Sequence, residues 1–261
     1  MVYRSYIKQL IQEKIMRGLL FFISTFLIMT GALKAENQFK LGQHYQNILT
    51  LNIKNSSDQQ FPLPAGKWVV TATSGEDARR SISGTQASSG TKLAMVYLAN
   101  IEDGKLKAAI RIRYTVENYS SGWSVPTFCS RNNLNFDGVK SAYDGTQTDC
   151  WGVSYARGAS KPGTPGARSI KYLQDLGVKI PIVVVYSQHY LADMSEYLAV
   201  GYLFNPEFEG ISRPENAGSF RTVDYHPTRI GNYPEKKAYV EKIVNWSKKW
   251  KKYIYQGFRG K

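Results

Sequence analysis

The sequence predicts an α+β fold: a predominantly antiparallel, sandwich-like β-sheet with a C-terminal amphipathic helix packed on it. Runs rich in Val, Ile, Thr and Tyr alternate with turn residues along most of the chain, and such runs favour strands. Residues 234–257 instead repeat aromatic and aliphatic side chains at helical spacing. A chain of 261 residues with 43% hydrophobic content is long enough for one sizeable core, so we expect a single folded domain.

The clearest hairpin is predicted to join residues 93–101 to residues 105–116 through Glu102-Asp103-Gly104. The Asp-Gly pair favours a hairpin here, because tight hairpin turns need residues that accept a positive φ. The second strand alternates, and its apolar face comprises Leu106, Ala108, Ile110, Ile112 and Tyr114. Its other face is basic and carries Lys105, Lys107, Arg111 and Arg113. We interpret the basic face as the solvated outer side of the sheet. The alternative is a flat surface for an anionic partner.

A second long hairpin is predicted from residues 180–192 and 197–205. It ends at Pro206, because proline cannot donate a hydrogen bond to the ladder. The apolar run over residues 182–186 indicates a central strand that is covered on both faces. A proline-set turn is predicted over residues 61–66, and a short helix over residues 169–176, ended by Gly177. The other predicted strands cover residues 48–53, 67–73 and 152–157.

The C-terminal helix over residues 234–257 begins with Pro234, which suits the first helical turn. Gly257 and Gly260 are predicted to end it. Its apolar arc comprises Tyr239, Val240, Ile243, Trp246, Trp250, Ile254 and Phe258. The lysines outside that arc are Lys237, Lys242, Lys248, Lys249, Lys251 and Lys252. We interpret the helix as packing its aromatic side on the sheet, with a helix that lies on anionic lipid as the alternative.

The N-terminal residues predict export. An apolar run over residues 19–29 follows Arg17 and leads to Ala35, which is the pattern of a secretory signal peptide cleaved after Ala35. An uncleaved N-terminal membrane anchor is the alternative. Translation from Met16 would give a signal of ordinary length. Residues 36–261 would form the exported domain, in the periplasm or at the outer membrane.

The charge balance predicts an anionic partner. The net charge is +14, and it is +10 without residues 1–35, which hold five basic residues and one acidic residue. Such an excess attracts anionic polymers and membrane surfaces. Nucleic acid is not expected as a partner, because the predicted compartment lies outside the cytosol.

Cys129 and Cys150 are the two cysteines of the chain, and in an oxidising compartment we expect them to form a disulfide. The alternative is a cysteine hydrolase with Cys150 as nucleophile and His189 as base. Asp149-Cys150-Trp151-Gly152 has some similarity to the Asp-Cys-Ser-Gly box of one family of peptidoglycan hydrolases. However, Trp151 stands where that box has a small serine, and the following residues do not predict a helix.

The sequence gives only weak indications of a metal site, a carboxylate pair or a sugar-binding surface. His44, His189 and His226 have no metal-ligand spacing, and we expect surface or core roles for them. Glu207 and Glu209 would suit a cation or a glycosidase pair, although a solvated strand end is the simpler interpretation. We expect no cofactor and no metal. The many tyrosines, including Tyr97, Tyr186, Tyr190 and Tyr197, are interpreted as sheet filling, with the stacking of sugar rings as the alternative.

Several motifs resemble an uncharacterised family of exported proteobacterial proteins. They are Leu63-Pro64-Ala65-Gly66-Lys67-Trp68, Asp149-Cys150-Trp151-Gly152, Phe204-Asn205-Pro206-Glu207, Trp246-Ser247-Lys248-Lys249-Trp250 and Gly257-Phe258. The resemblance implies export and a shared fold, and it implies no mechanism.

We therefore expect a non-catalytic binding protein of the cell envelope that contacts an anionic polymer or a lipid surface. The residues expected to make this contact are Lys107, Arg111, Arg113, Lys248, Lys249, Lys251 and Lys252. A cell-wall hydrolase is one alternative. A structural or assembly factor that adds a strand to a protein partner in the envelope is another.

Overall fold

The computed structural model describes residues 38–54, 56, 58–77, 92–117, 127–130, 136–141, 148–193, 196–215 and 222–259. From Phe39 onward these residues belong to one compact unit. The strands are β1 (His44–Tyr45), β2 (Ile48–Leu51), β3 (Gln59–Pro62), β4 (Trp68–Asp77), β5 (Lys92–Glu102), β6 (Lys105–Thr115), β7 (Asp137–Ser141), β8 (Thr148–Arg157), β9 (Val183–Ala192) and β10 (Tyr197–Phe204). The helices are α2 (Thr127–Ser130), α3 (Pro165–Asp175), η1 (Pro206–Glu209), η2 (Ile230–Asn232) and α4 (Pro234–Arg259).

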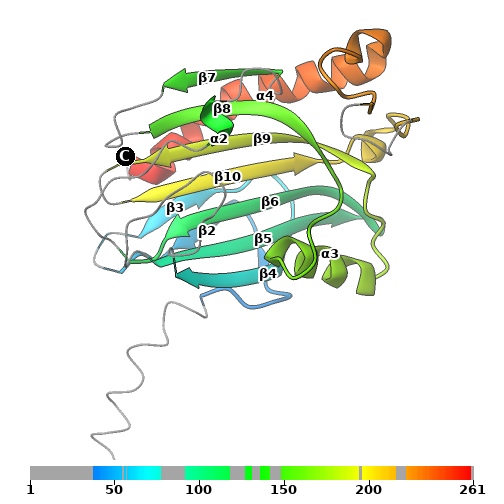
Figure 1. Ribbon diagram of the computed structural model, residues 1–261. Coiled ribbons are helices and arrows are strands. Elements are labelled where there is room, and N and C mark those ends of the chain that lie inside the picture. Colours follow the sequence, from blue (N-terminus) through cyan, green and yellow to red (C-terminus); the bar gives the residue numbers. More distant parts are fainter. Residues whose placement is uncertain are drawn as a thin grey trace, which may run out of the picture. The chain divides into compact units, whose positions relative to one another are not determined.

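Within the described residues, eight strands form one sheet in the order β1-β4-β5-β6-β10-β9-β8-β7 (Figure 1). Every neighbouring pair in that sheet is antiparallel. The strands β2 and β3 form a separate antiparallel pair. The predicted fold class, an antiparallel β-rich domain with a C-terminal helix packed on it, is therefore confirmed.

The hairpin of β5 and β6 is confirmed, and its turn uses the predicted residues. Asp103 and Gly104 have φ angles of 51° and 69°, as a tight hairpin turn requires. A bulge between Asn100 and Ile101 then shifts the register, so that Leu106 pairs with Ile101. Leu106 therefore packs against α3 and not beside Ile110, and the predicted apolar face is wrong at this one position.

The second hairpin, β9 and β10, is also confirmed. Asp193 closes its turn, because the backbone N–H of Glu196 donates to Asp193 Oδ1 at 2.8 Å. The apolar strand β9 lies inside the sheet between β10 and β8, as the run over residues 182–186 predicted. One predicted turn is wrong: Phe61 and Pro62 belong to β3, where Pro62 pairs with Ile48 at the end of the strand. A proline is tolerated there because the ladder needs no donor from it.

The two faces of the main sheet are covered differently (Figure 1). We call the side that contacts α4 and the β2–β3 pair the helix face, and its core includes Val96, Ile112 and Val200. We call the opposite side the arginine face, because Arg111 alternates with Ile110 and Ile112 along β6. Helix α3 covers the β4–β6 end of the arginine face, where Leu173 packs with Val69, Ala99, Leu106 and Val178.

Helix α3 begins at Pro165 and not at residue 169, because Thr164 caps it and its side chain accepts a hydrogen bond from Ala167 N. It ends as predicted before Gly177, which has a φ of 74°. Among the helices that the structure describes, none has both the length and the hydropathy of a membrane span.

Helix α4 packs its predicted apolar arc on the sheet. Ile254 and Phe258 join the core over β3, and Tyr239, Val240 and Ile243 pack on β8 and β9. Trp250 Nε1 donates to the Tyr202 hydroxyl at 2.7 Å. The predicted end at Gly257 is wrong, because the helix continues to Arg259. Gly257 instead allows a close approach: a Cβ there would lie 2.5 Å from the carbonyl oxygen of Gln60 in β3.

Candidate functional site

A row of residues crosses the arginine face at right angles to the strands, and glycines make up half of it. We call it the glycine row. In register order it comprises Tyr97, Arg111, Gly201, Gln188, Gly152 and Gly138. Glycines inside strands often mark a place where another group approaches the backbone closely. Of its polar side chains, Arg111 is exposed, Tyr97 is half-buried and Gln188 is buried.

Arg111 and Gln188 meet across β10, above Gly201. Arg111 Nη2 donates to Gln188 Oε1 at 2.8 Å. A Cβ at Gly201 would lie 2.9 Å from that oxygen and 3.8 Å from Arg111 Nη2. The missing side chain at Gly201 therefore allows the pair to form. Gln188 is itself buried, and its amide nitrogen donates to the carbonyl oxygen of His189 at 3.4 Å, so the partner of Arg111 is held in place.

Arg111 keeps most of its donors for a ligand. A guanidinium has five N–H donors, and the described part of the protein provides Gln188 as hydrogen-bond acceptor and no carboxylate within ion-pair distance. The side chain is solvent-exposed. Desolvation by the surrounding protein lowers the pKa of Arg111, but nearby phenols, first Tyr97 and Tyr190, raise it to a net value above the ordinary one. Arg111 is therefore a permanently charged hydrogen-bond donor for anions.

Aromatic side chains border the glycine row on β9. Tyr186 and Tyr190 flank Gln188 on the same face, and both are half-buried. The ring of Phe128 lies 6.2 Å from that of Tyr186 and 5.7 Å from that of Tyr190. Aromatic faces with nearby donors are the usual components of sugar-binding surfaces, because a ring packs on the apolar side of a sugar while polar groups bind its substituents.

The disulfide holds this aromatic cluster together. Cys129 and Cys150 are bonded, as the sequence predicted, and their Cα atoms lie 5.8 Å apart. Cys129 follows Phe128 in α2, and Cys150 in β8 pairs in register with Tyr190. The covalent bond therefore fixes Phe128 against the tyrosines of β9.

The other predicted basic residues of β6 have different surroundings. Lys107 donates to Glu102 at 2.7 Å and lies 5.2 Å from the centre of the Phe208 ring. Arg113 is only 7% exposed, so the interpretation of this face as a solvated outer surface is wrong at that position. The reason is its register partner Ala199, which belongs to a buried apolar cluster on this side of the sheet.

The predicted lysines of α4 lie on the helix face, opposite Arg111. Lys251 forms an ion pair with Asp149 at 3.0 Å, and Lys252 lies 4.8 Å from the ring centre of Tyr253. Lys248 and Lys249 are exposed. Because the sheet lies between, one flat partner cannot contact Arg111 and these lysines together.

A cysteine nucleophile is not available in this arrangement. Cys150 is oxidised, and it lies on the arginine face, whereas His189 pairs with Trp151 on the helix face. Burial lowers the pKa of His189 to about 3, with a smaller contribution from Lys251, so the imidazole is neutral. Ser187 Oγ lies 2.9 Å from its Nε2. His189 is a core histidine, as expected.

Glu207 and Glu209 each bind a different basic side chain. Glu207 accepts from Arg213 Nε at 2.7 Å and from the backbone N–H of Ile182 at 3.1 Å. Glu209 forms an ion pair with Lys242. His44 is exposed and His226 contacts Thr228, and the described residues contain no cluster of His, Cys, Asp and Glu that could hold a metal ion.

Sequence reasoning missed Gln188, Gly201 and Phe128. Gly201 was detectable, because an isolated glycine inside an apolar strand indicates a close approach. Comparisons of the chain with models of protein families, with curated proteins and with solved structures find no match. The resemblance to exported proteobacterial proteins therefore stays a prediction.

Proposed function

We propose that this protein is an exported, non-catalytic binding protein of the cell envelope, and that the glycine row binds an acidic glycan through Arg111. The observation that supports it most is the state of Arg111, an exposed guanidinium without a carboxylate partner among the described residues. The groups around this guanidinium are instead phenols, among them Tyr97 and Tyr190. The disulfide is consistent with an oxidising compartment.

Several features favour a glycan over a lipid surface as the partner of this site. The exposed side chain of the row is Arg111, and a sugar chain can reach its guanidinium from solvent. Its rings can contact Tyr186 and Tyr190, and a carboxylate can bind the donors of Arg111 that Gln188 does not use. A lipid bilayer would instead need an exposed basic and aromatic helix face.

The test uses tetragalacturonate as an acidic probe and maltotetraose as a neutral one, each titrated into the mature, oxidised protein by calorimetry. Arg111→Gln should weaken tetragalacturonate binding by about 1.5–3 kcal/mol, about ten- to a hundredfold, because a charge-assisted hydrogen-bond donor is lost. Raising the ionic strength from about 0.05 M to about 0.5 M should weaken wild-type binding as well.

Lys249→Gln is the matched control, because it removes one exposed positive charge from α4 on the other face. It should leave tetragalacturonate binding unchanged. Equal affinity of wild type and Arg111→Gln would reject the proposal. Binding to phosphatidylglycerol vesicles that depends on Lys249 and not on Arg111 would instead favour a lipid surface.

A further inference from the structure

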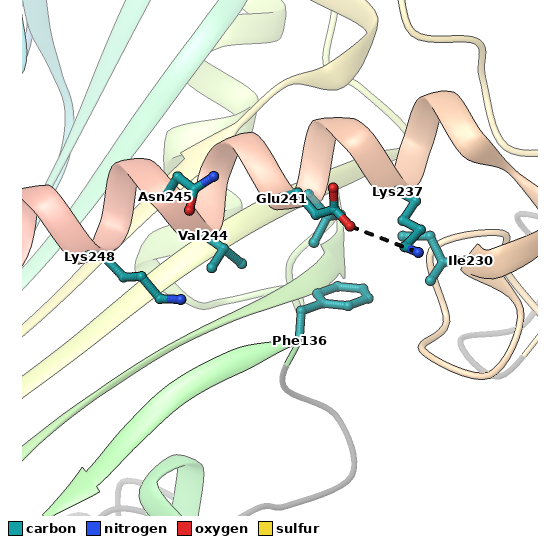
Figure 2. A pocket seen from close by; sticks show the side chains of 8 residues that line it. Phe136, Ile230, Lys237, Glu241, Val244, Asn245 and Lys248 are labelled. Atoms are coloured by element: carbon teal, nitrogen blue, oxygen red, sulfur yellow. Dashed lines mark ion pairs between the residues drawn. The ribbon is translucent and has the colours of Figure 1, made fainter.

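A hollow lies on the helix face, at the β7–β8 side of α4. It has a volume of about 440 Å³, within the range of small-molecule sites. Its apolar wall comprises Phe136, Ile230, Val240 and Val244. Figure 2 shows the ring of Phe136 facing α4 across the hollow, with Ile230 at one end. We call it the α4 pocket.

The walls of the α4 pocket are well supported. Val240 and Val244 are anchored in the core with Ile243, and Ile230 is only 7% exposed. Phe136 is held from both sides: its N–H donates to the carbonyl oxygen of Val153 at 2.8 Å, and its ring lies 6.2 Å from that of Tyr155. A pocket with such walls keeps its shape when it is empty, so a ligand does not have to order them.

Two opposite charges border the α4 pocket at its Ile230 end. Lys237 and Glu241 are one helical turn apart, so α4 presents both on the side that lines the hollow (Figure 2). Their charged atoms are 3.9 Å apart, which is beyond hydrogen-bond distance. In the part of the chain that the structure describes, neither charged group has another partner. The ammonium and the carboxylate therefore keep their hydrogen-bonding capacity for a ligand.

Helix α3 carries an exposed ion pair of the same spacing that is in direct contact. Lys171 Nζ donates to Asp175 Oδ1 at 2.8 Å. A separation of four residues therefore does not by itself hold two opposite charges apart. Neither residue of this pair lines the α4 pocket, so the pair on α3 provides a matched control for the one on α4.

We propose that the α4 pocket binds a free amino acid with an aromatic side chain. The two charges of an α-amino acid are attached to one carbon atom, so its carboxylate can bind Lys237 while its ammonium group binds Glu241. Its ring would lie between Phe136 and Val244, where it is removed from water. A ring is favoured over an aliphatic chain, because paired aromatic rings gain energy beyond the area they bury.

The test compares L-phenylalanine with two analogues that each lack one charge. Phenethylamine has no carboxylate, and 3-phenylpropanoate has no ammonium group. Calorimetry on the mature, oxidised protein measures the three affinities. Each analogue should bind about two- to fivefold more weakly than L-phenylalanine, since exposed charge interactions are of this size. Val244→Phe fills the hollow and should abolish the binding of all three compounds.

Exchange of either charge should change the order of the affinities. Lys237→Gln leaves the carboxylate of Glu241 without its counter-ion, so phenethylamine should then bind more tightly than 3-phenylpropanoate. Glu241→Gln should give the opposite order. A pair that only stabilised the helix would not change the order of the three compounds. Both residues are exposed, so these variants test the pocket even if Val244→Phe does not fold.

Lys171→Gln and Asp175→Asn are the controls, and each should leave all three affinities unchanged. Equal binding of the three compounds by the wild type would overturn the proposal, as would no binding of L-phenylalanine. An order of affinities that Lys237→Gln and Glu241→Gln leave unaltered, or binding that persists in folded Val244→Phe, would also contradict it. The glycine row lies on the opposite face of the sheet, so either proposal can fail without the other.

Discussion

Lys236 and Asp224 form an ion pair of 2.6 Å from which solvent is almost completely removed, with side-chain exposures of 2% and 0%. The ammonium group also lies 4.8 Å from the ring centre of Tyr233, and Asp224 Oδ2 accepts from the backbone N–H of Glu215 at 3.2 Å. The pair joins the first turns of α4 to the segment before η2. It therefore fixes where the C-terminal helix begins.

Lys236→Met should destabilise the protein by about 3–5 kcal/mol, because it leaves a buried carboxylate without its partner. Urea unfolding of the oxidised protein measures this change. Lys237→Met, at the exposed neighbouring position, is the control and should change the free energy of unfolding by less than about 1 kcal/mol. The double variant Asp224→Asn/Lys236→Met should recover much of the loss. Similar results for the two lysine variants would contradict a stabilising role for the pair.

The Asp224 pair also predicts a loss of stability in acid. Desolvation raises the pKa of Asp224. The hydrogen bonds from Lys236 and from Glu215 N lower this pKa by more, so its net value is below the usual one. A lowered carboxyl pKa contributes stability above the unfolded-state value of about 3.9 and loses it as the pH falls through the folded-state value. Asp224→Asn should remove this part of the acid dependence, seen in unfolding curves below about pH 4.

His189 predicts a separate pH dependence at milder acidity. Its pKa in the folded protein is about 3, against 6.5 for an ordinary histidine, because burial disfavours the charged ring. The unfolded chain therefore binds the proton first as the pH falls below about 6.5, and stability declines by up to about 1.4 kcal/mol per pH unit. His189→Gln should flatten the slope between about pH 6 and pH 4.

Removal of the disulfide should cost about 3 kcal/mol in the chain-entropy model, because the closed loop spans a sequence separation of 21. We expect Cys129→Ser/Cys150→Ser to unfold at a correspondingly lower urea concentration. The wild type in excess dithiothreitol should behave like the double variant, which checks that the effect comes from the bond and not from the serines. Unchanged unfolding in both cases would contradict the prediction.

Gly257→Ala should destabilise the protein by about 1–3 kcal/mol, because the new methyl group meets the backbone of β3. It would lie 2.5 Å from Gln60 O and 3.1 Å from Pro62 Cδ. Gly231→Ala is the matched control, since a Cβ there meets no atom within 4 Å. Thermal unfolding monitored by circular dichroism compares the two. An equal midpoint for both variants would mean that α4 does not depend on this close approach.

Gly201→Ala should test the Arg111–Gln188 contact of the glycine row. The new Cβ would lie 2.9 Å from Gln188 Oε1, so the amide must move and release Arg111. Because Gln188 is buried, we also expect a loss of about 1–3 kcal/mol in the free energy of unfolding. Tetragalacturonate affinity should fall, and the Arg111 Nε resonance should shift. An unshifted resonance would show that Gln188 does not position Arg111.

The sequence by itself determined the features that depend on local chemistry. Asp103 and Gly104 accept a positive φ wherever they occur, so the β5–β6 turn was predictable. The aromatic arc of α4 follows from helical periodicity, and the two cysteines had no other partner of their kind. The same is true of the apolar run in β9, whose composition alone placed it inside the sheet.

Only the tertiary structure decided which distant residues meet. Arg111 and Gln188 are 77 residues apart, and they meet because β10 lies between β6 and β9 with a glycine at the crossing. The bulge that turns Leu106 away from Ile110, and the burial of Lys236 against Asp224, depend likewise on elements remote in sequence. Periodicity and turn propensity act over a few residues, whereas register and burial are set by the partner strand or helix that packs there.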